Sequence, residues 1–80
     1  MKEIVIKTEY IKLDQLLKFA EIVPSGGLAK QIILDECVEV NGETCTMRGK
    51  KIREGDKVHV SLVDEDIDLH EEYDLIVRGK

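Results

Sequence analysis

The sequence predicts one small domain of the α+β class, spanning residues 1–80. Apolar residues make up 42% of the chain and charged residues 36%, a balance typical of globular proteins, since disordered chains combine low hydrophobicity with high net charge. Apolar residues recur with helical spacing between residues 12 and 34, and they alternate with polar residues before and after that stretch. These two periods predict two helices flanked by short strands.

A strand and a helix are expected first. Isoleucines that alternate with charged residues predict a short, half-buried strand over residues 3–7. An apolar stripe with the spacing of one helix face predicts an amphipathic helix over residues 12–21; its members are Leu13, Leu16, Leu17 and Ala20. Asp14 and Lys18 lie one turn apart, and we expect them to pair on the outer face of this helix.

A second helix is expected after Pro24, because the residue before a proline disfavours the helical conformation and thereby separates the two helices. Ser25 is a suitable N-cap for this helix. Its buried stripe is predicted to consist of Leu28, Ala29, Ile32 and Ile33. Lys30 and Leu34 would then lie on the opposite, exposed face.

A β-hairpin is expected at Asn41-Gly42, a dipeptide typical of two-residue type I′ turns. The turn would place Cys45 opposite Val38 on the core face, with Cys37 on the other face, so a disulfide between the cysteines is not expected. No apolar run approaches the ~20 residues that cross a bilayer, and the first residues alternate charge and apolarity, unlike a signal peptide. We therefore expect a cytoplasmic protein with reduced thiols and no membrane association.

The C-terminal part combines strands with an acidic segment. Residues 57–62 alternate and predict a strand, and a last strand is expected over residues 73–78, beside the N-terminal one. The polar residues 64–72 between them are expected to be loose. Residues 1–63 carry as many basic as acidic side chains, so the net charge of −5 belongs entirely to the C-terminal segment. The overall negative charge therefore does not exclude nucleic acid as a partner.

Residues suited to catalysis or metal binding are few and scattered. Cys37 and Cys45 lie eight positions apart without a nearby histidine, unlike the closely paired ligands of a zinc site. His59 falls in a predicted strand, where an outward-facing strand residue is expected rather than a catalytic base, and His70 falls in an acidic loop. We therefore expect no enzyme activity, no metal and no cofactor.

Two features favour the binding of phosphate groups. At Ser25-Gly26-Gly27, the unpaired N–H groups of a helix N-terminus would lie beside residues without side chains, so an anionic oxygen could approach the backbone. The alternative is that these glycines only form a tight corner after Pro24. The second feature is a basic cluster, for which the alternative is a solvated surface; it consists of Arg48, Lys50, Lys51, Arg53 and Lys57.

Five motifs, in order and spacing, resemble the S4 RNA-binding domain, and within that superfamily the small stand-alone YaaA-like proteins. The resemblance covers about residues 4–62, most of the chain. It depends on Ile11-Lys12-Leu13-Asp14-Gln15-Leu16-Leu17-Lys18, Ser25-Gly26-Gly27-x-Ala29-Lys30, Val38-x-Val40-Asn41-Gly42-Glu43, Arg48-Gly49-Lys50-Lys51-Ile52 and Gly55-Asp56-x-Val58.

The resemblance implies an S4-like (αL) fold, in which two helices pack on a small, bent, mainly antiparallel sheet of four to five strands. Residues 4–62 would form its core, and residues 63–80 an acidic segment with a last strand. It also implies binding of structured ribosomal or transfer RNA, in association with the ribosome or another ribonucleoprotein. We expect the protein to be a monomer. Carried over by position, the RNA-binding residues are Lys12, Ser25, Gly27, Lys30, Arg48, Lys50, Lys51 and Arg53.

Two residues depart from the S4 pattern. Gly26 stands where many S4 domains have an arginine, so one contact of the wider family is missing. Glu36 replaces the usual glycine after the second helix, which puts a non-glycine residue in that corner or alters the helix end. No aromatic residue lies within the basic cluster, so recognition of RNA shape is expected in preference to reading of unpaired bases. Phe19 is expected to belong partly to the core.

Two other classes of function remain open. A protein-interaction module on an S4-like scaffold is favoured by the net negative charge and by an exposed Leu34 beside Lys30. A ubiquitin-like sulfur or acyl carrier is suggested by Val-Asn-Gly-Glu and Gly-Asp-x-Val, which also occur in β-grasp folds. Such carriers end in Gly-Gly, whereas this sequence ends in Arg78-Gly79-Lys80.

Overall fold

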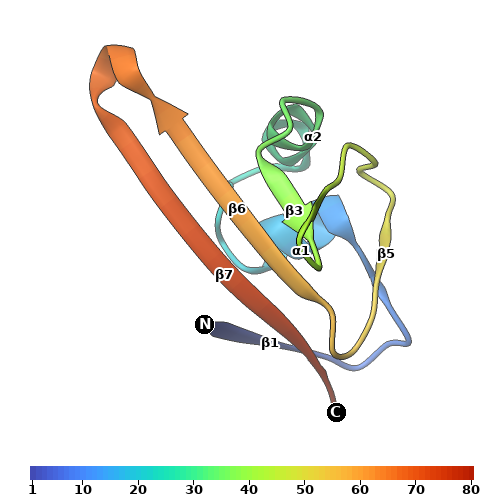
Figure 1. Cartoon of the computed structure of the whole chain (residues 1–80). Coiled ribbons are helices and arrows are strands. Elements are labelled where there is room, and N and C mark those ends of the chain that lie inside the picture. Colours follow the sequence, from blue (N-terminus) through green and yellow to red (C-terminus); the bar gives the residue numbers. More distant parts are fainter.

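A mixed sheet of five strands runs through the molecule in the computed structural model, which describes residues 1–80 (Figure 1). The strand order is β1-β7-β6-β3-β4, and β1 and β7 are the one parallel pair. The strands are β1 (Lys2–Ile6), β3 (Val38–Val40), β4 (Glu43–Thr44), β6 (Lys57–Asp64) and β7 (Leu69–Gly79). A separate antiparallel ribbon pairs β2 (Ile11–Lys12) with β5 (Lys51–Ile52). The predicted α+β class is confirmed.

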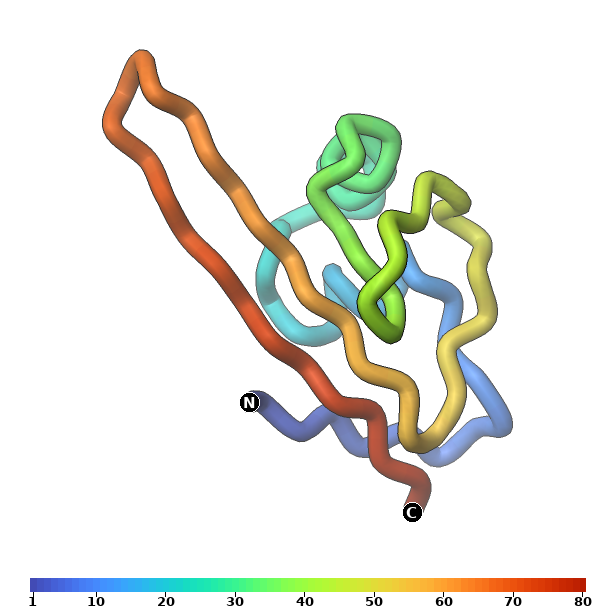
Figure 2. Tube along the Cα trace, in the orientation of Figure 1, coloured from blue at the N-terminus to red at the C-terminus, as the bar shows by residue number.

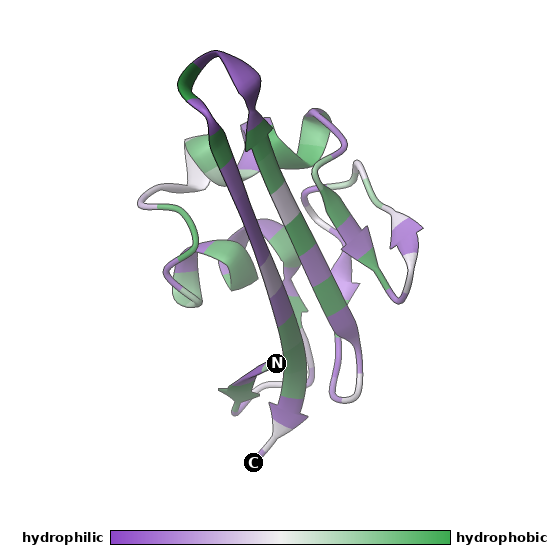
Figure 3. Ribbon diagram, turned by 60° about the vertical axis from the view of Figure 1, so that its left-hand side comes forward, coloured by the Kyte–Doolittle hydropathy of each residue, from purple (hydrophilic) through white to green (hydrophobic).

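Two helices cover one face of the sheet (Figure 3): α1 (Leu13–Phe19) and α2 (Gly26–Leu34). Both are shorter than a typical isolated helix that is stable in water, so their packing against each other and the sheet is what maintains them. The predicted N-cap is confirmed, because Ser25 Oγ accepts a hydrogen bond from the backbone N–H of Leu28 at 3.2 Å. Neither helix has the length and apolar character needed to span a membrane.

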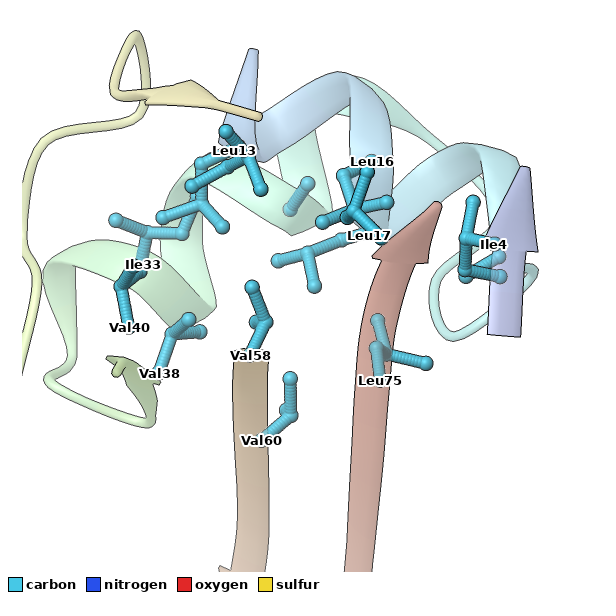
Figure 4. Packing of buried hydrophobic residues seen from close by; sticks show 14 of the residues in the cluster. Ile4, Leu13, Leu16, Leu17, Ile33, Val38, Val40, Val58, Val60 and Leu75 are labelled. Atoms are coloured by element: carbon cyan, nitrogen blue, oxygen red, sulfur yellow. The ribbon is translucent and has the colours of Figure 1, made fainter. Parts of the chain in front are cut away.

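The core lies between the helices and the sheet, where 17 buried apolar residues form one cluster (Figure 4). Leu13, Leu16 and Leu17 of α1 are completely buried and point toward the strands. Val58 and Val60 of β6 approach them from the sheet, as the alternation of residues 57–62 predicted. Full burial of one such side chain contributes about 1.5–3 kcal/mol to the free energy of unfolding.

Two residues expected in the core lie at the surface. Leu28 is 44% exposed, because only Ala29, Ile32 and Ile33 of α2 face the rest of the core. Phe19 is 62% exposed at the end of α1, since it falls outside the stripe that faces the sheet. The predictions for these two side chains were wrong.

The hairpin at Asn41-Gly42 forms with the predicted register. Val40 pairs with Glu43, and both turn residues have positive φ angles, +50° for Asn41 and +86° for Gly42, as a type I′ turn requires. The backbone N–H of Cys45 donates to the carbonyl oxygen of Val38 at 2.9 Å. Both cysteines are free thiols that pack against the edge of the core.

The corner after α2 contains a non-glycine residue, one of the two outcomes expected from the sequence. Glu36 has a φ of +62°, which is the left-handed region that favours glycine. The backbone N–H of Cys37, which follows it, donates to the carbonyl oxygen of Ile32 at 3.1 Å and ties the helix end to the start of β3.

Residues 64–72 are not loose, contrary to the expectation from the sequence. They form the distal half of a long hairpin in which β6 and β7 pair from Lys57 and Ile76 to Asp64 and Leu69. A single 3₁₀ turn (Glu65–Ile67) closes it. The distal half projects beyond the helices (Figure 2), and its β7 residues are mostly hydrophilic (Figure 3). No core covers either face there, so its sequence lacks the apolar alternation of a half-buried strand.

Candidate nucleic-acid interface

The ribbon of β2 and β5 gathers basic side chains on its outer face. Ile11 pairs with Ile52, and these two residues face the core. Because strand residues alternate between faces, their neighbours lie on the opposite, outer side. We call this set the basic ribbon; it consists of Tyr10, Lys12, Lys51 and Arg53.

A short loop, residues 47–50, is fastened to the start of α1. The backbone N–H of Leu13 donates to the carbonyl oxygen of Lys50 at 2.9 Å, and that of Asp14 donates to the carbonyl oxygen of Arg48 at 3.1 Å. These loop carbonyls satisfy two of the N–H groups that a helix leaves unpaired at its first turn. The loop therefore has a fixed position, and the start of α1 is not open to an anion.

An ion pair strengthens this attachment. Asp14 is 6% exposed, and its Oδ2 lies 3.6 Å from a guanidinium nitrogen of Arg48. The expected exposed pair between Asp14 and Lys18 does not form, because Asp14 turns toward the loop rather than toward solvent. An i, i+4 spacing could not reveal this, since it describes neighbours on the same helix only.

A second set of bonds holds the far end of the basic ribbon. Asn41 Nδ2 donates to Asp56 Oδ1 at 3.1 Å, and Asp56 Oδ2 accepts the backbone N–H of Arg53 at 2.8 Å. Asn41 Oδ1 accepts the backbone N–H of Lys57 at 2.9 Å. A polar groove runs between the hairpin at Asn41-Gly42 and β5, and Lys50, Lys51 and Arg53 are among the residues that line it. The hairpin thus forms one fixed wall of this groove.

Tyr10 is the residue of this surface that sequence reasoning missed. The ammonium group of Lys51 lies 5.0 Å from the centre of the Tyr10 ring, and the guanidinium carbon of Arg53 lies 5.5 Å from it. Tyr10 lies 41 positions before Lys51 and 43 before Arg53 in the chain. Only the β2–β5 register brings them together, and two-residue strands leave too short a pattern to predict that register.

The start of α2 provides a second group of candidate residues. Ser25 is occupied by the cap, with its Oγ bound to the N–H of Leu28 and its carbonyl oxygen to the N–H of Ala29. The N–H groups of Gly26 and Gly27 precede the first hydrogen bond within the helix and lack such partners. Lys30 is exposed one turn further on.

Neither glycine is needed for the shape of the corner. Gly26 and Gly27 are helical, and neither has a positive φ angle. A Cβ atom added at Gly26 would meet no atom within 4 Å, and one added at Gly27 would meet only Ser25 Oγ at 4.0 Å. Alanine would fit and would favour the helix. The tight-corner interpretation therefore loses its physical basis, and an accessible backbone remains.

The predicted residues fall into two groups. Lys12, Arg48, Lys50, Lys51 and Arg53 are brought together by the ribbon and the loop. Ser25, Gly27 and Lys30 lie at the start of α2, and no hydrogen bond or ion pair joins them to the first group. The packing of α1 against α2 connects the two groups through the core.

The acidic side chains of the β6–β7 hairpin interact with its own histidines. His59 Nδ1 lies 2.8 Å from Asp74 Oδ1, and His59 Nε2 lies 3.3 Å from Glu72 Oε1. The hydrogen bond to Asp74 and the negative charges of Asp74, Glu72 and Glu39 raise the pKa of His59, although partial burial opposes this. His70 also pairs with Glu72, at 3.2 Å. No ion pair joins the hairpin to the basic ribbon.

Two comparisons with known proteins relate this chain to a family. The "Probable ribosome maturation protein RlbA" of Bacillus subtilis (strain 168) is 44% identical to this chain over 55 residues, which cover 69% of the chain and 78% of that relative. Residues 4–69 match the S4 domain family. The match includes both helices, the basic ribbon and the hairpin at Asn41-Gly42. The chain is a member of the S4 domain family.

Proposed function

We propose that this protein is a non-catalytic RNA-binding protein that recognises structured ribosomal or transfer RNA through its phosphate backbone. Membership of the S4 family and a relative named as a ribosome maturation protein support an RNA-associated, ribosome-related role. In this proposal the protein acts as a cytoplasmic monomer without a cofactor and associates with a ribosomal particle.

The observation that carries the proposal is a group of cations without acidic partners. Lys12, Lys50, Lys51 and Arg53 are exposed, and none of them takes part in an ion pair. Neighbouring like charges repel one another, and a phosphate backbone relieves this repulsion while releasing its own counterions. A basic surface that is only solvated would not need the fixed position that Asp14 and the loop carbonyls give it.

The start of α2 supplies a second phosphate contact in this proposal. The N–H groups of Gly26 and Gly27 and the partial positive charge of the helix end favour an anionic oxygen. Lys30 adds a full charge one turn away. Ser25 acts mainly by fixing the first turn, because its hydroxyl oxygen already accepts the N–H of Leu28.

Contacts of this kind position RNA rather than read its sequence. Lysine and arginine bound to phosphate oxygens fix the register of the protein on a duplex, but they carry no information on base identity. A double-stranded RNA offers regularly spaced phosphates on both sides of its shallow minor groove. Folded RNA is therefore the expected ligand.

Charge reversal tests the proposal. Lys50→Glu with Lys51→Glu should abolish binding to fluorescently labelled ribosomal RNA stem-loops in an anisotropy titration. The matched control is Lys7→Glu with Lys80→Glu, which changes the net charge equally but leaves the basic ribbon intact; it should bind nearly as tightly as the wild type. Circular dichroism establishes that both variants are folded. Equal losses of RNA affinity in the two variants would show that net charge causes the effect and that Lys50 and Lys51 do not form a binding site.

A protein-interaction module is the second candidate function, and the exposed side of α2 favours it. Leu28 is 44% and Leu34 is 52% exposed, and they flank the cationic Lys30. After nuclease treatment, the wild type should still co-purify with a protein partner from ribosomal particles, and Leu28→Ser with Leu34→Ser should not. Equal co-purification of the wild type and the variant would contradict this second function.

A further inference from the structure

We propose that the Tyr10 ring is a stacking platform for one unpaired base, so that the preferred ligand is a duplex RNA with a bulged or unstacked nucleotide. This inference rests on the RNA-binding function proposed above and deepens it. The basic cluster itself contains no aromatic residue, as the sequence showed, but the β2–β5 pairing brings Tyr10 beside it. The ring lies within 5.0 Å of Lys51 Nζ and 5.5 Å of Arg53 Cζ, and both of these cations belong to the proposed phosphate-binding group.

The fold does not require an aromatic side chain at this position. Tyr10 lies outside the hydrophobic core cluster and outside the partly buried apolar residues that pack against it. Its hydroxyl group makes no hydrogen bond within the protein. An aromatic ring placed among cations at the surface, with neither a core to fill nor a hydroxyl partner, is an arrangement suited to a ligand with an aromatic face.

The ring is nevertheless held in a defined place. Thr8 Oγ1 donates to the backbone carbonyl oxygen of Tyr10 at 2.7 Å and fixes the chain before β2. The next residue, Ile11, pairs with the fully buried Ile52. These contacts anchor the backbone on both sides of the ring. A ligand that stacks on the ring would therefore lose little free energy to ordering of the protein.

The cations that now cover the ring are the groups that RNA phosphates would attract. An exposed cation over an aromatic ring is a weak contact, whereas an ion pair with a phosphate also gains from counterion release. When Lys51 and Arg53 turn toward phosphates, the face of Tyr10 becomes free. A base stacks on such a face more strongly than an exposed lysine does.

A base inside a continuous duplex cannot reach the ring, because it is stacked between its neighbours. A bulged nucleotide or a nucleotide at a helix junction presents an open face, and single-stranded elements of this kind are where RNA-binding proteins use aromatic side chains. The phosphate contacts would thus hold the duplex, and Tyr10 would select duplexes with an unpaired base next to the basic ribbon.

The test compares two RNA stem-loops that differ only in one bulged 2-aminopurine nucleotide. Wild-type protein should bind the bulged RNA more tightly and quench the 2-aminopurine fluorescence. Tyr10→Leu should weaken binding of the bulged RNA roughly tenfold, which corresponds to ~1.4 kcal/mol, abolish the quenching and leave affinity for the continuous stem unchanged. Tyr10→Phe keeps the ring and should behave as the wild type. Phe19→Leu, which removes an exposed aromatic ring outside the basic ribbon, should change neither affinity.

The outcomes separate this inference from the function on which it rests. If Tyr10→Leu quenches the 2-aminopurine fluorescence as the wild type does, or loses affinity equally for both RNAs, the proposed stacking platform is wrong while phosphate binding stands. If wild-type protein binds neither RNA and the charge-reversal variant behaves identically, both proposals are overturned. Thermal unfolding of Tyr10→Leu within a few degrees of the wild type, the range of an ordinary surface substitution, shows that the comparison concerns folded protein.

Discussion

The carboxylate of Asp14 and the guanidinium of Arg48 lie 3.6 Å apart and join the start of α1 to residues 47–50, which we call the basic loop. The carboxylate is buried and the guanidinium is mostly exposed, with side-chain exposures of 9% and 61%. The pair lies beside the backbone hydrogen bond from Asp14 N–H to the carbonyl oxygen of Arg48. The basic loop is consequently positioned by an acidic residue that would itself repel RNA if it were exposed.

Removal of this pair should affect RNA binding more than stability. We expect Asp14→Asn to lower the free energy of unfolding by about 1 kcal/mol or less, because the exposed guanidinium is screened by water. RNA affinity should fall several-fold as the loop loses its fixed position, although the substitution makes the net charge less negative. Urea unfolding and anisotropy titration measure the two effects. An affinity higher than that of the wild type would show that charge matters here and loop position does not.

Alanine at Gly26 and Gly27 should separate folding from binding. Since a Cβ atom at Gly26 meets nothing within 4 Å, Gly26→Ala with Gly27→Ala should raise stability by about 0.5–1 kcal/mol through the higher helix propensity of alanine. The added methyl groups should weaken RNA binding, because they obstruct approach to the backbone N–H groups. A more stable variant with unchanged affinity would exclude the start of α2 as a phosphate site.

Glycine at position 36 should stabilise the protein. Glu36 has a φ of +62°, a conformation that costs a non-glycine residue roughly 1 kcal/mol. Glu36→Gly relieves this strain but increases the freedom of the unfolded chain, so a net gain of about 0.5 kcal/mol is expected. Calorimetry should show a rise in Tm of a few degrees. Glu36→Ala, which removes the carboxylate but keeps the Cβ atom, is the control and should show no such gain.

The stability of the β6–β7 hairpin should depend on pH through His59. Its folded-state pKa is raised, first by the hydrogen bond to Asp74 and then by the surrounding carboxylates. A group with a raised folded pKa contributes its full stabilisation below its unfolded pKa of ~6.5, and this contribution is lost as pH rises through the folded value. Urea midpoints measured from about pH 6 to pH 9 should therefore fall for the wild type and change less for His59→Gln.

The comparison needs a control from the same hairpin. His70→Gln removes a more exposed imidazole, whose side chain is 66% exposed against 31% for His59, and it should keep the pH dependence of the wild type. If the two variants lose the dependence equally, the interaction of His59 with Asp74 is not its source.

Neutralisation of the hairpin tip should increase RNA affinity at low salt. We expect the tip to repel RNA only at long range, because no acidic side chain there pairs with the basic ribbon. Glu65→Gln, Asp66→Asn and Asp68→Asn together should strengthen binding a few-fold at about 50 mM salt and hardly at all at about 200 mM, since salt screens distant charges. A gain that persists at the higher salt concentration would contradict long-range repulsion. Truncation after Leu62 is unsuitable, because it removes the buried Leu75 and Val77.

Local patterns in the sequence predicted local structure well. Ser25 caps α2 and Asn41-Gly42 turns the hairpin in the predicted register because these features depend on neighbouring residues only. The five motifs identified the S4 family through their order and spacing along most of the chain. The assignment of individual RNA-binding residues stays a prediction, since it depends on a ligand rather than on the fold.

Contacts between distant segments could not be predicted in this way. The extension of β6 and β7 through residues 64–72 was missed because a hairpin with both faces in water has no apolar alternation, and its pairing is maintained by the strands below it. The burial of Asp14 was missed because its partner, Arg48, belongs to another part of the chain.

The sequence by itself determined the two helices, the N-cap of the second, the tight hairpin and the basic cluster, since each depends on residues within about one or two turns of chain. The tertiary structure alone decided that Tyr10 lies beneath Lys51 and Arg53, because only the pairing of β2 with β5 brings residues so far apart onto one face. In a two-residue strand the side-chain period is too short to read, so the face that each residue occupies is set by its partner strand.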